Sequence, residues 1–384
     1  MTRILITGGA GFIGSRLAER LAAAGHEVTV FDNLSAQVHG ADGAETSPTY
    51  LKAAEAGRFV RGDVRSFDDI AAAVPGHDAV VHLAAETGTA QSMYAQQHYA
   101  DVNVTGTINL LRSVSDDPGK SVRKIVVAST RAIYGEGQYL DGDRVISADP
   151  RDPARMAAGD FEVHSPRTGA PMQPRATDEE CLAKPSSTYA ITKLAQEQLI
   201  LNFASTSGVE TVALRLQNVY GPGQSLKNPY TGLLSVFATR ILNGKPLTIF
   251  EDGLCTRDFV YIDDVVTALT LATEAEGVSG RIINVGSGAA TTILDAAKGL
   301  ERELGLSTAQ EIPGMFRAGD IRHNFADISR ARALVGYAPT RTFDEGVAAF
   351  AAWVRTQPVA EDLFDRSIAE LKERKLYGEV TAAE

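Results

Sequence analysis

A glycine-rich loop at residues 8–14 constrains the fold of this chain more than any other feature of its sequence. The loop follows a short apolar run at residues 3–7 and precedes a stretch with helical periodicity, Phe12–Ala24, and a second apolar run, Glu27–Phe31. This strand–loop–helix–strand order is the context in which a glycine motif indicates nucleotide binding. Glycine allows a tight turn, and the helix N-terminus offers N–H groups and a positive dipole end to phosphates. The loop therefore predicts a pyrophosphate site, with contacts from Gly8, Gly11, Phe12, Ile13 and Gly14.

An aspartate at the end of the second predicted strand, Asp32, indicates which dinucleotide is preferred. A carboxylate there accepts hydrogen bonds from the adenosine ribose and repels a 2′-phosphate, so it favours NAD over NADP. Further strands are predicted at residues 58–61, 79–85 and 124–128, and small residues after the fourth strand let backbone approach a cofactor. The remaining residues expected to contact NAD are Asn33, Asp63, Val64, Leu83, Ala84 and Ala85.

The order of elements predicts an α/β fold with two parts. Strands alternate with helical segments through the N-terminal part, as in a Rossmann-like doubly wound parallel sheet. We expect an NAD-binding domain at residues 1–218 and a smaller C-terminal α/β substrate-binding lobe at residues 219–384, with a segment at about 240–265 returning to the sheet. An insert at about 136–186 has no sustained period, and loops this long are usually functional or disordered. A charged amphipathic helix is predicted at Val359–Lys375.

Composition narrows the choice of partners and compartment. The formal net charge of −11 argues against nucleic acid or an anionic membrane as a main partner, because phosphates are bound by Lys/Arg patches. We expect no membrane helix, since no uncharged run is long enough, and no signal peptide before the first strand. Cys181 and Cys255 show no metal-ligand spacing, so we expect no metal site and a cytoplasmic location without disulfides. Motifs for metal-dependent or serine-dependent hydrolysis are absent from the sequence.

Tyr189 and Lys193 lie four residues apart in a predicted helix at residues 187–202. Residues at this spacing share a helix face, so the ammonium can lie beside the phenol and lower its pKa. A free phenol titrates near pH ~10, and acting as a base near neutrality requires a shift worth roughly 4 kcal/mol. Thr130 ends the fifth strand, where parallel sheets bind ligands, and its hydroxyl can relay a proton. With an NAD site nearby, these residues predict hydride chemistry on a hydroxyl group.

These motifs resemble the extended short-chain dehydrogenase/reductase superfamily, and within it the NAD-dependent nucleotide-sugar epimerases and dehydratases. The resemblance covers nearly the whole chain and rests on residues 7–14, 82–85, 128–130, 214–222, 256–265, 284–288 and 319–322, on Asn103 and on Tyr189-x-x-x-Lys193. Residues 32–35, 37–40 and 91–94 and the insert look most similar to the dTDP-L-rhamnose 4-epimerase group. The insert of that group often carries a Cys-Pro-x-Cys-Gly knuckle. Here the matching stretch, residues 165–169, reads Ser-Pro-Arg-Thr-Gly, so a metal-binding role is lost.

The resemblance implies a catalytic role for three residues. Tyr189 as phenolate takes the proton of a sugar hydroxyl, Thr130 relays it, and Lys193 lowers the tyrosine pKa and binds the nicotinamide ribose. NAD takes the hydride and is regenerated in each turnover, so it is expected to stay tightly bound. Asn103 is left open between bracing the backbone and catalysis. The substrate-binding residues that the resemblance implies are Glu86, Thr87, Thr130, Asn218, Asn228, Arg257 and Arg322, with Tyr230 and Thr231 nearby.

Several functions remain open within this resemblance. Dehydratase relatives carry Asp-Glu directly after the catalytic Thr, whereas this chain has Arg131 and Ala132, which argues against dehydration. The expected activity is 4-epimerisation of a nucleotide-diphosphate sugar through a 4-keto intermediate, for example dTDP-L-rhamnose to dTDP-6-deoxy-L-talose. The alternatives are a UDP-hexose or UDP-hexuronate 4-epimerase, another NAD-dependent nucleotide-sugar oxidoreductase, and a non-catalytic NAD-sensing protein. The resemblance also implies a homodimer formed by helices at about residues 94–115 and 187–203.

Overall fold

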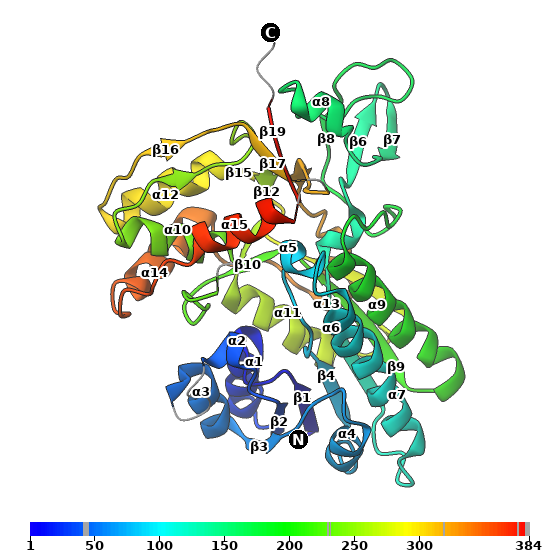
Figure 1. Ribbon diagram of the computed structural model, residues 1–384. Coiled ribbons are helices and arrows are strands. Elements are labelled where there is room, and N and C mark those ends of the chain that lie inside the picture. The colour runs from blue at the N-terminus through cyan, green and yellow to red at the C-terminus, as the bar shows by residue number, and fades with distance from the viewer. Residues whose placement is uncertain (41–45, 229, 231, 318, 375, 381–384) are drawn as a thin grey trace.

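A fully parallel sheet of seven strands forms the centre of the molecule (Figure 1). The computed structural model describes residues 1–40, 46–228, 230, 232–317, 319–374 and 376–380. In sheet order the strands are β14 (Arg281–Val285), β9 (Glu210–Leu216), β5 (Lys124–Thr130), β4 (Ala79–His82), β1 (Arg3–Thr7), β2 (Glu27–Asp32) and β3 (Arg58–Arg61). The chain changes direction across the sheet between β1 and β4, and doubly wound sheets bind ligands at such a switch point. The predicted Rossmann-like fold is confirmed.

Helices bury both faces of this sheet. One face packs against α1 (Phe12–Ala23), α3 (Pro48–Ala56) and α11 (Ile262–Glu274), and the other against α4 (Phe67–Ala73), α7 (Gly106–Asp116) and α9 (Thr188–Ser207). Successive side chains of β1 point to opposite faces, so Ile4 and Ile6 join the first cluster and Leu5 joins the second. Burial on both faces explains why these strands read as nearly continuous apolar runs.

The loop between β1 and α1 is tight enough to require glycine. Gly8 has a φ of +68°, and a Cβ there would lie 2.7 Å from the amide nitrogen of Ala84. A Cβ on Gly14 would lie 2.4 Å from the carbonyl oxygen of Gly8. Both distances are shorter than real carbon contacts, so side chains here would push apart the helix, the loop and the segment after β4.

The C-terminal half forms a smaller lobe and also returns to the central sheet. The lobe's helices are α10 (Leu233–Leu242), α12 (Ile293–Leu304), α14 (Phe343–Val354) and α15 (Phe364–Glu373), whereas α13 (Ser329–Val335) packs against β14 and α11. Its short strands are β10 (Asn218–Tyr220), β11 (Leu247–Thr248), β12 (Thr256–Arg257), β13 (Phe259–Tyr261), β15 (Thr291–Thr292), β16 (Gln310–Glu311), β17 (Met315–Arg317), β18 (His323–Asn324) and β19 (Tyr377–Glu379). Among the described residues, no helix is both long enough and apolar enough to span a membrane.

Two expectations for this half differ from the structure. The returning strand is β14, which lies later than residues 240–265, because residues 259–261 pair with β10 instead of with the central sheet. Helix α11 does begin within the expected segment, and it packs on the sheet. The helix expected at Val359–Lys375 is shorter, since α15 begins only at Phe364 and ends at Glu373, after which β19 pairs antiparallel with β17. Lys375 itself lies outside the described residues.

The insert at 136–186 is an ordered unit that stands away from the central sheet (Figure 1). It contains β6 (Gln138–Asp141), β7 (Arg144–Ser147), α8 (Pro153–Ala157) and β8 (Gln173–Pro174). Its turn at residues 165–169 is closed by Ser165, whose Oγ accepts from the backbone N–H of Arg167 (3.1 Å) and Thr168 (3.0 Å) and donates to Asp141 (2.7 Å). Hydrogen bonds thus close the turn at which the sequence lacks a metal knuckle.

Buried ion pairs fasten the insert to the C-terminal lobe. Arg151 contacts Glu136 at 2.8 Å and Glu251 at 2.9 Å, and all three side chains are almost fully buried. Arg322 contacts Glu162 of the insert at 2.6 Å and Asp252 of the lobe at 2.6 Å. Because a broken buried ion pair leaves an uncompensated charge, these contacts resist separation of the two units.

Candidate active site

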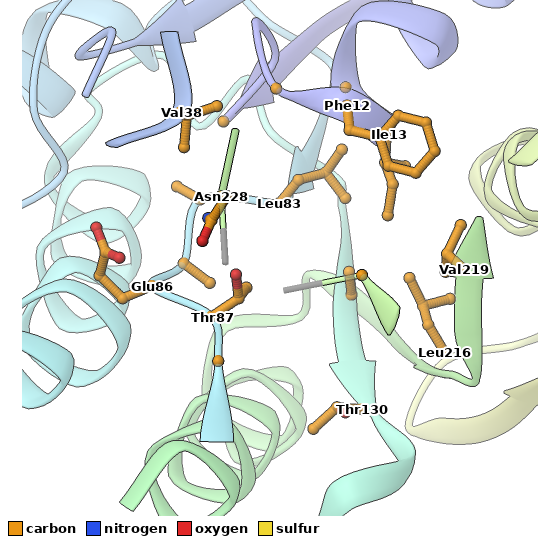
Figure 2. A pocket seen from close by; sticks show the side chains of 18 of the residues that line it. Phe12, Ile13, Val38, Leu83, Glu86, Thr87, Thr130, Leu216, Val219 and Asn228 are labelled. Carbon is orange, nitrogen blue, oxygen red and sulfur yellow. The ribbon is translucent and has the colours of Figure 1, made fainter. Parts of the chain in front are cut away.

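A cavity of about 490 Å³ opens at the carboxyl ends of β1, β2, β4, β5 and β9. Figure 2 shows Phe12 and Ile13 at one end of the view, Thr130 at the other, and Leu83, Thr87 and Asn228 between them. Of the residues predicted for cofactor contact, those that line the cavity are Gly8, Gly11, Phe12, Ile13, Gly14, Asp32, Asn33, Val64, Leu83, Ala84, Ala85, Tyr189 and Lys193. The tertiary structure therefore gathers residues from far apart in the sequence around one cavity.

The glycine-loop end of the cavity suits the adenosine and pyrophosphate of a dinucleotide. Asp32 is 8% exposed, and its carboxylate accepts hydrogen bonds from the backbone N–H of Ala10 (3.0 Å) and Leu34 (2.8 Å). Burial raises the pKa of Asp32, while the Leu34 N–H and the nearby His39 ring oppose that rise. The carboxylate is held in place at the strand end, and the glycines leave room for backbone contact with phosphates. These residues fit the predicted group.

Asp63 does not line this cavity. Its carboxylate pairs with Arg65 at 2.7 Å and accepts from the Asn33 amide at 3.0 Å. These contacts, with burial opposing them, hold the pKa of Asp63 at about 2. The neighbouring Gly62 and Val64 reach the cavity instead.

Two hydrogen bonds between the side-chain amides of Gln37 and Gln91 join two segments beside the cofactor end of the cavity. The Nε2 of Gln37 donates to Oε1 of Gln91 at 2.9 Å, and the Nε2 of Gln91 donates to Oε1 of Gln37 at 3.0 Å. Gln37 lies on α2 (Ala36–His39) with Val38, which points into the cavity in Figure 2, and Gln91 lies on α5 (Thr89–Ser92). Tyr99 on α6 (Gln96–Tyr99) also donates to the Thr87 carbonyl at 2.6 Å.

The three residues predicted to be catalytic meet at the other end. Thr130 ends β5, and Tyr189 and Lys193 lie in the first turns of α9, whose N-terminus is capped by Ser187 accepting from the Ala190 N–H at 3.2 Å. Burial raises the pKa of Tyr189, whereas a hydrogen bond from Thr130 and the positive charge of Arg131 lower it. The ammonium of Lys193 donates to the Ala128 carbonyl at 2.6 Å and to the side-chain oxygen of Gln196.

A buried polar chain holds that lysine. Gln196 accepts from Lys193, and its Nε2 lies 3.0 Å from Nε2 of His82 and 2.9 Å from the Thr107 hydroxyl. The Nδ1 of His82 lies 2.7 Å from the hydroxyl of Thr7. Burial, followed by the charge of Lys193, lowers the pKa of His82 to about 3, so the ring is neutral near pH 7. Burial likewise lowers the pKa of Lys193 to about 7.

Asn103 braces the backbone beside the site. It lies in a wide helical turn, Ala100–Thr105, where π-type hydrogen bonding interrupts the helix between α6 and α7. Its side chain accepts from the Glu86 N–H at 2.8 Å and donates to the Glu86 carbonyl at 3.1 Å and to the Thr192 hydroxyl at 3.0 Å. Of the two roles left open for Asn103, the structure supports bracing, since it ties the segment after β4 to α9.

The structure brings only some of the predicted substrate residues together. Glu86, Thr87, Thr130, Asn218 and Asn228 line the cavity, as does Tyr230, while Thr231 lies outside the described residues. Arg257 and Arg322 do not line it. The guanidinium of Arg257 contacts Asp320 at 3.2 Å, and Arg322, only 1% exposed, is surrounded by carboxylates.

Other cavity residues were not assigned a role from sequence. They include Gln37, Val38, His39, Ser129, Arg131, Leu216, Gln217, Val219, Tyr220, Gln224 and Leu233. Residues 37–40 and 91–94 did show subgroup similarity, but similarity alone could not indicate that the two segments touch. The Lys193-x-x-Gln196 spacing is a local signal that predicts the Gln196 contact, because residues three apart are neighbours on a helix.

The neutral state of buried His82 predicts a pH-dependent stability. The unfolded ring binds a proton below about pH 6.5 and the folded ring does not, so the folded state loses stability as the pH falls from 6.5 toward 5. In His82→Gln the free energy of unfolding should fall less steeply with decreasing pH, by up to roughly 1.4 kcal/mol per pH unit. Denaturant unfolding at several pH values measures it, with His98→Gln on the surface as the control. Equal slopes for wild type and His82→Gln would contradict the assignment.

Comparison with known proteins agrees with this geometry. Residues 4–156 and 163–286 match the family model described as "NAD dependent epimerase/dehydratase family". The chain is 38% identical to a dTDP-L-rhamnose 4-epimerase of Burkholderia thailandensis, with 92% of this chain and 94% of that protein covered. It is also similar to the solved structure of a UDP-glucuronic acid 4-epimerase from Bacillus cereus in complex with UDP-glucuronic acid and NAD, with a TM-score of 0.72, 28% identity and coverage of 92% and 99%.

A UDP-glucose 4-epimerase structure from Thermotoga maritima, with UDP-glucose, gives the same TM-score of 0.72 at 28% identity, covering 92% of this chain and 98% of that one. These matches span both the sheet and the smaller lobe, and they confirm the resemblance that the motifs predict. The chain belongs to the NAD dependent epimerase/dehydratase family.

Proposed function

We propose that this protein is an NAD-dependent 4-epimerase of a nucleotide-diphosphate sugar. The observation that carries the proposal is the meeting of Thr130, Tyr189 and Lys193 at one end of a cavity whose other end is built from the glycine loop and Asp32. Similarity to 4-epimerases of three different sugar nucleotides supports the same reaction class. The absence of a carboxylate at positions 131 and 132 favours epimerisation over dehydration.

The side chains that line the cavity have distinct roles in the proposed reaction. Tyr189 takes the proton from the sugar hydroxyl through Thr130 and gives it back when the ketone is reduced. The Gln196 amide and the Ala128 carbonyl hold Lys193 at the same end of the cavity as Thr130 and Tyr189. The glycine loop and Asp32 would hold NAD, which would supply a reversible hydride acceptor and so allow inversion without net oxidation. Tight retention of NAD fits the residues that enclose this end, including the Gln37–Gln91 pair.

The sugar we propose is a 6-deoxyhexose, as in the conversion of dTDP-L-rhamnose to dTDP-6-deoxy-L-talose. It is supported by the 38% identity to a dTDP-L-rhamnose 4-epimerase over nearly the whole chain. A UDP-hexuronate or UDP-hexose substrate is the second candidate, favoured by the solved relatives. A non-catalytic NAD sensor is disfavoured because Thr130, Tyr189 and Lys193 are all present. A cytoplasmic location stays a prediction, consistent with two cysteines that are both free and buried.

Replacing the catalytic phenol provides the first test. Tyr189→Phe should lower kcat by several orders of magnitude, because the phenol is the group proposed to accept the proton from the Thr130 hydroxyl. It should leave NAD retention near the wild-type level, since the glycine loop and Asp32 that would hold the adenosine and pyrophosphate are unchanged. Product formation followed by NMR and absorbance of the retained cofactor measure the two effects. Tyr50→Phe, away from the cavity, is the matched control, and wild-type turnover by Tyr189→Phe would refute the mechanism.

The choice of sugar and the route of hydrogen can be tested together. The enzyme is incubated in deuterated water with a panel of dTDP-L-rhamnose, UDP-glucose and UDP-glucuronate, and the products are resolved by chromatography and NMR. We expect inversion at C4 of dTDP-L-rhamnose without deuterium there, because the hydride removed from that carbon is the one returned. Deuterium at the inverted carbon would point to proton abstraction at carbon, and turnover of a UDP-sugar alone would select the second candidate.

We also infer a homodimer that packs α7 and α9 of two copies together. Each helix carries a large exposed apolar side chain, Ile108 on α7 (46% exposed) and Ile191 on α9 (54% exposed). Ile191→Asp should shift the sedimentation of the protein from dimer to monomer, because the charge would be buried at the interface. Leu182→Asp, at a residue that is 66% exposed outside these helices, is the control. A monomeric wild-type protein would exclude the dimer.

A further inference from the structure

Arg131 is a charged residue that directly follows the catalytic threonine, Thr130. Its backbone begins the short helical turn Arg131–Tyr134, and the Thr130 hydroxyl accepts from the Ala132 N–H at 3.2 Å. The turn therefore fixes Arg131 at the carboxyl end of β5, on the wall of the cavity beside Thr130.

The guanidinium of Arg131 has no partner among the residues that the structure describes. Arg131 as a residue is partly exposed, its Nη1 is enclosed and unpaired, and its side chain makes no hydrogen bond or ion pair with any described residue. Buried arginines of this chain are paired with carboxylates: Arg151 with Glu136 at 2.8 Å, Arg215 with Glu197 at 2.6 Å, and Arg322 with Asp252 at 2.6 Å. An unpaired buried cation is costly, so a missing partner is expected to come from the ligand.

The charges around Arg131 indicate the sign of that partner. Arg257 repels it, whereas Asp320, Tyr189 and Glu136 attract it without direct contact. Burial, followed by repulsion from Arg257, lowers the pKa of Arg131 to about 9, so it remains cationic near neutral pH. Its charge also acts on the Tyr189 phenol, which places it near the reacting sugar rather than near the adenosine. A planar guanidinium holds two oxygens of a carboxylate or phosphate at once.

We propose that Arg131 is a substrate-binding residue that holds an anionic oxygen of the sugar nucleotide beside the reaction centre. Two groups of such a substrate offer that chemistry: the phosphate that links the sugar, and a carboxylate carried by the sugar itself. The proposal rests on the proposed function for the identity of the ligand. Binding of a nucleoside diphosphate, however, does not depend on turnover.

Calorimetric titration of wild type, Arg131→Met and Arg131→Lys with dTDP, dTDP-L-rhamnose and UDP-glucuronate tests the proposal. Loss of a charged hydrogen bond should raise Kd about tenfold or more in Arg131→Met, with partial recovery in Arg131→Lys. If the guanidinium holds the phosphate, the Kd values of all three ligands rise. If it holds a sugar carboxylate, only the Kd of UDP-glucuronate rises. Arg144→Met, at an exposed residue of β7, should keep the wild-type Kd values.

Thermal unfolding of the same variants separates binding from a structural role. Arg131→Met should unfold at the wild-type temperature or above, because it removes a buried charge that has no partner in the chain. A lower unfolding temperature would overturn the proposal, and so would Kd values within twofold of wild type for all three ligands. Failure of the proposed epimerase activity would appear differently, as absence of product from wild type that still binds these ligands.

Discussion

The attachment of α9 to β5 is the interaction on which the active site depends. Glu197 of α9 is fully buried, and its carboxylate accepts from the Ser129 hydroxyl at 2.6 Å and from Arg215 at 2.6 and 3.0 Å. One turn earlier on the helix, Lys193 donates to the Ala128 carbonyl. Because buried polar groups lose much free energy when unpaired, these contacts specify one position of the helix along the strand. That position brings Tyr189 to Thr130.

Pairing of buried polar groups also holds the cavity walls together, with Arg131 as the exception. The polar chain from Thr7 through His82 and Gln196 to Lys193 is closed within the protein, so the cofactor end is organised before any ligand arrives. The insert, which lacks the metal knuckle of the resembled group, is held by hydrogen bonds and buried ion pairs instead. Arg131 breaks the pattern of paired buried charges, and it does so beside the reaction centre.

Sequence reasoning succeeded where the determining contacts are local. The strands from β1 to β5, the glycine loop and Asp32 lie where the apolar runs and the loop predicted them, because both faces of the sheet are buried and the turn admits only small residues. It failed where an element's partner is distant in the chain. Residues 259–261 pair with β10, and residues 377–379, which follow the expected helix, form a strand that pairs with β17; no local pattern indicates either pairing.

For the site, the sequence by itself determined the chemistry: a dinucleotide loop, a carboxylate for the ribose, and a phenol, an ammonium and a hydroxyl for proton transfer. Only the tertiary structure decided which charged residues face the cavity. Arg322 is neutralised by carboxylates contributed by the insert and the lobe, and Arg257 by Asp320, whereas Arg131 stays unpaired on the cavity wall. The reason is physical: the environment of a buried charge is set by groups from segments far apart in the sequence, and spacing along the chain does not encode it.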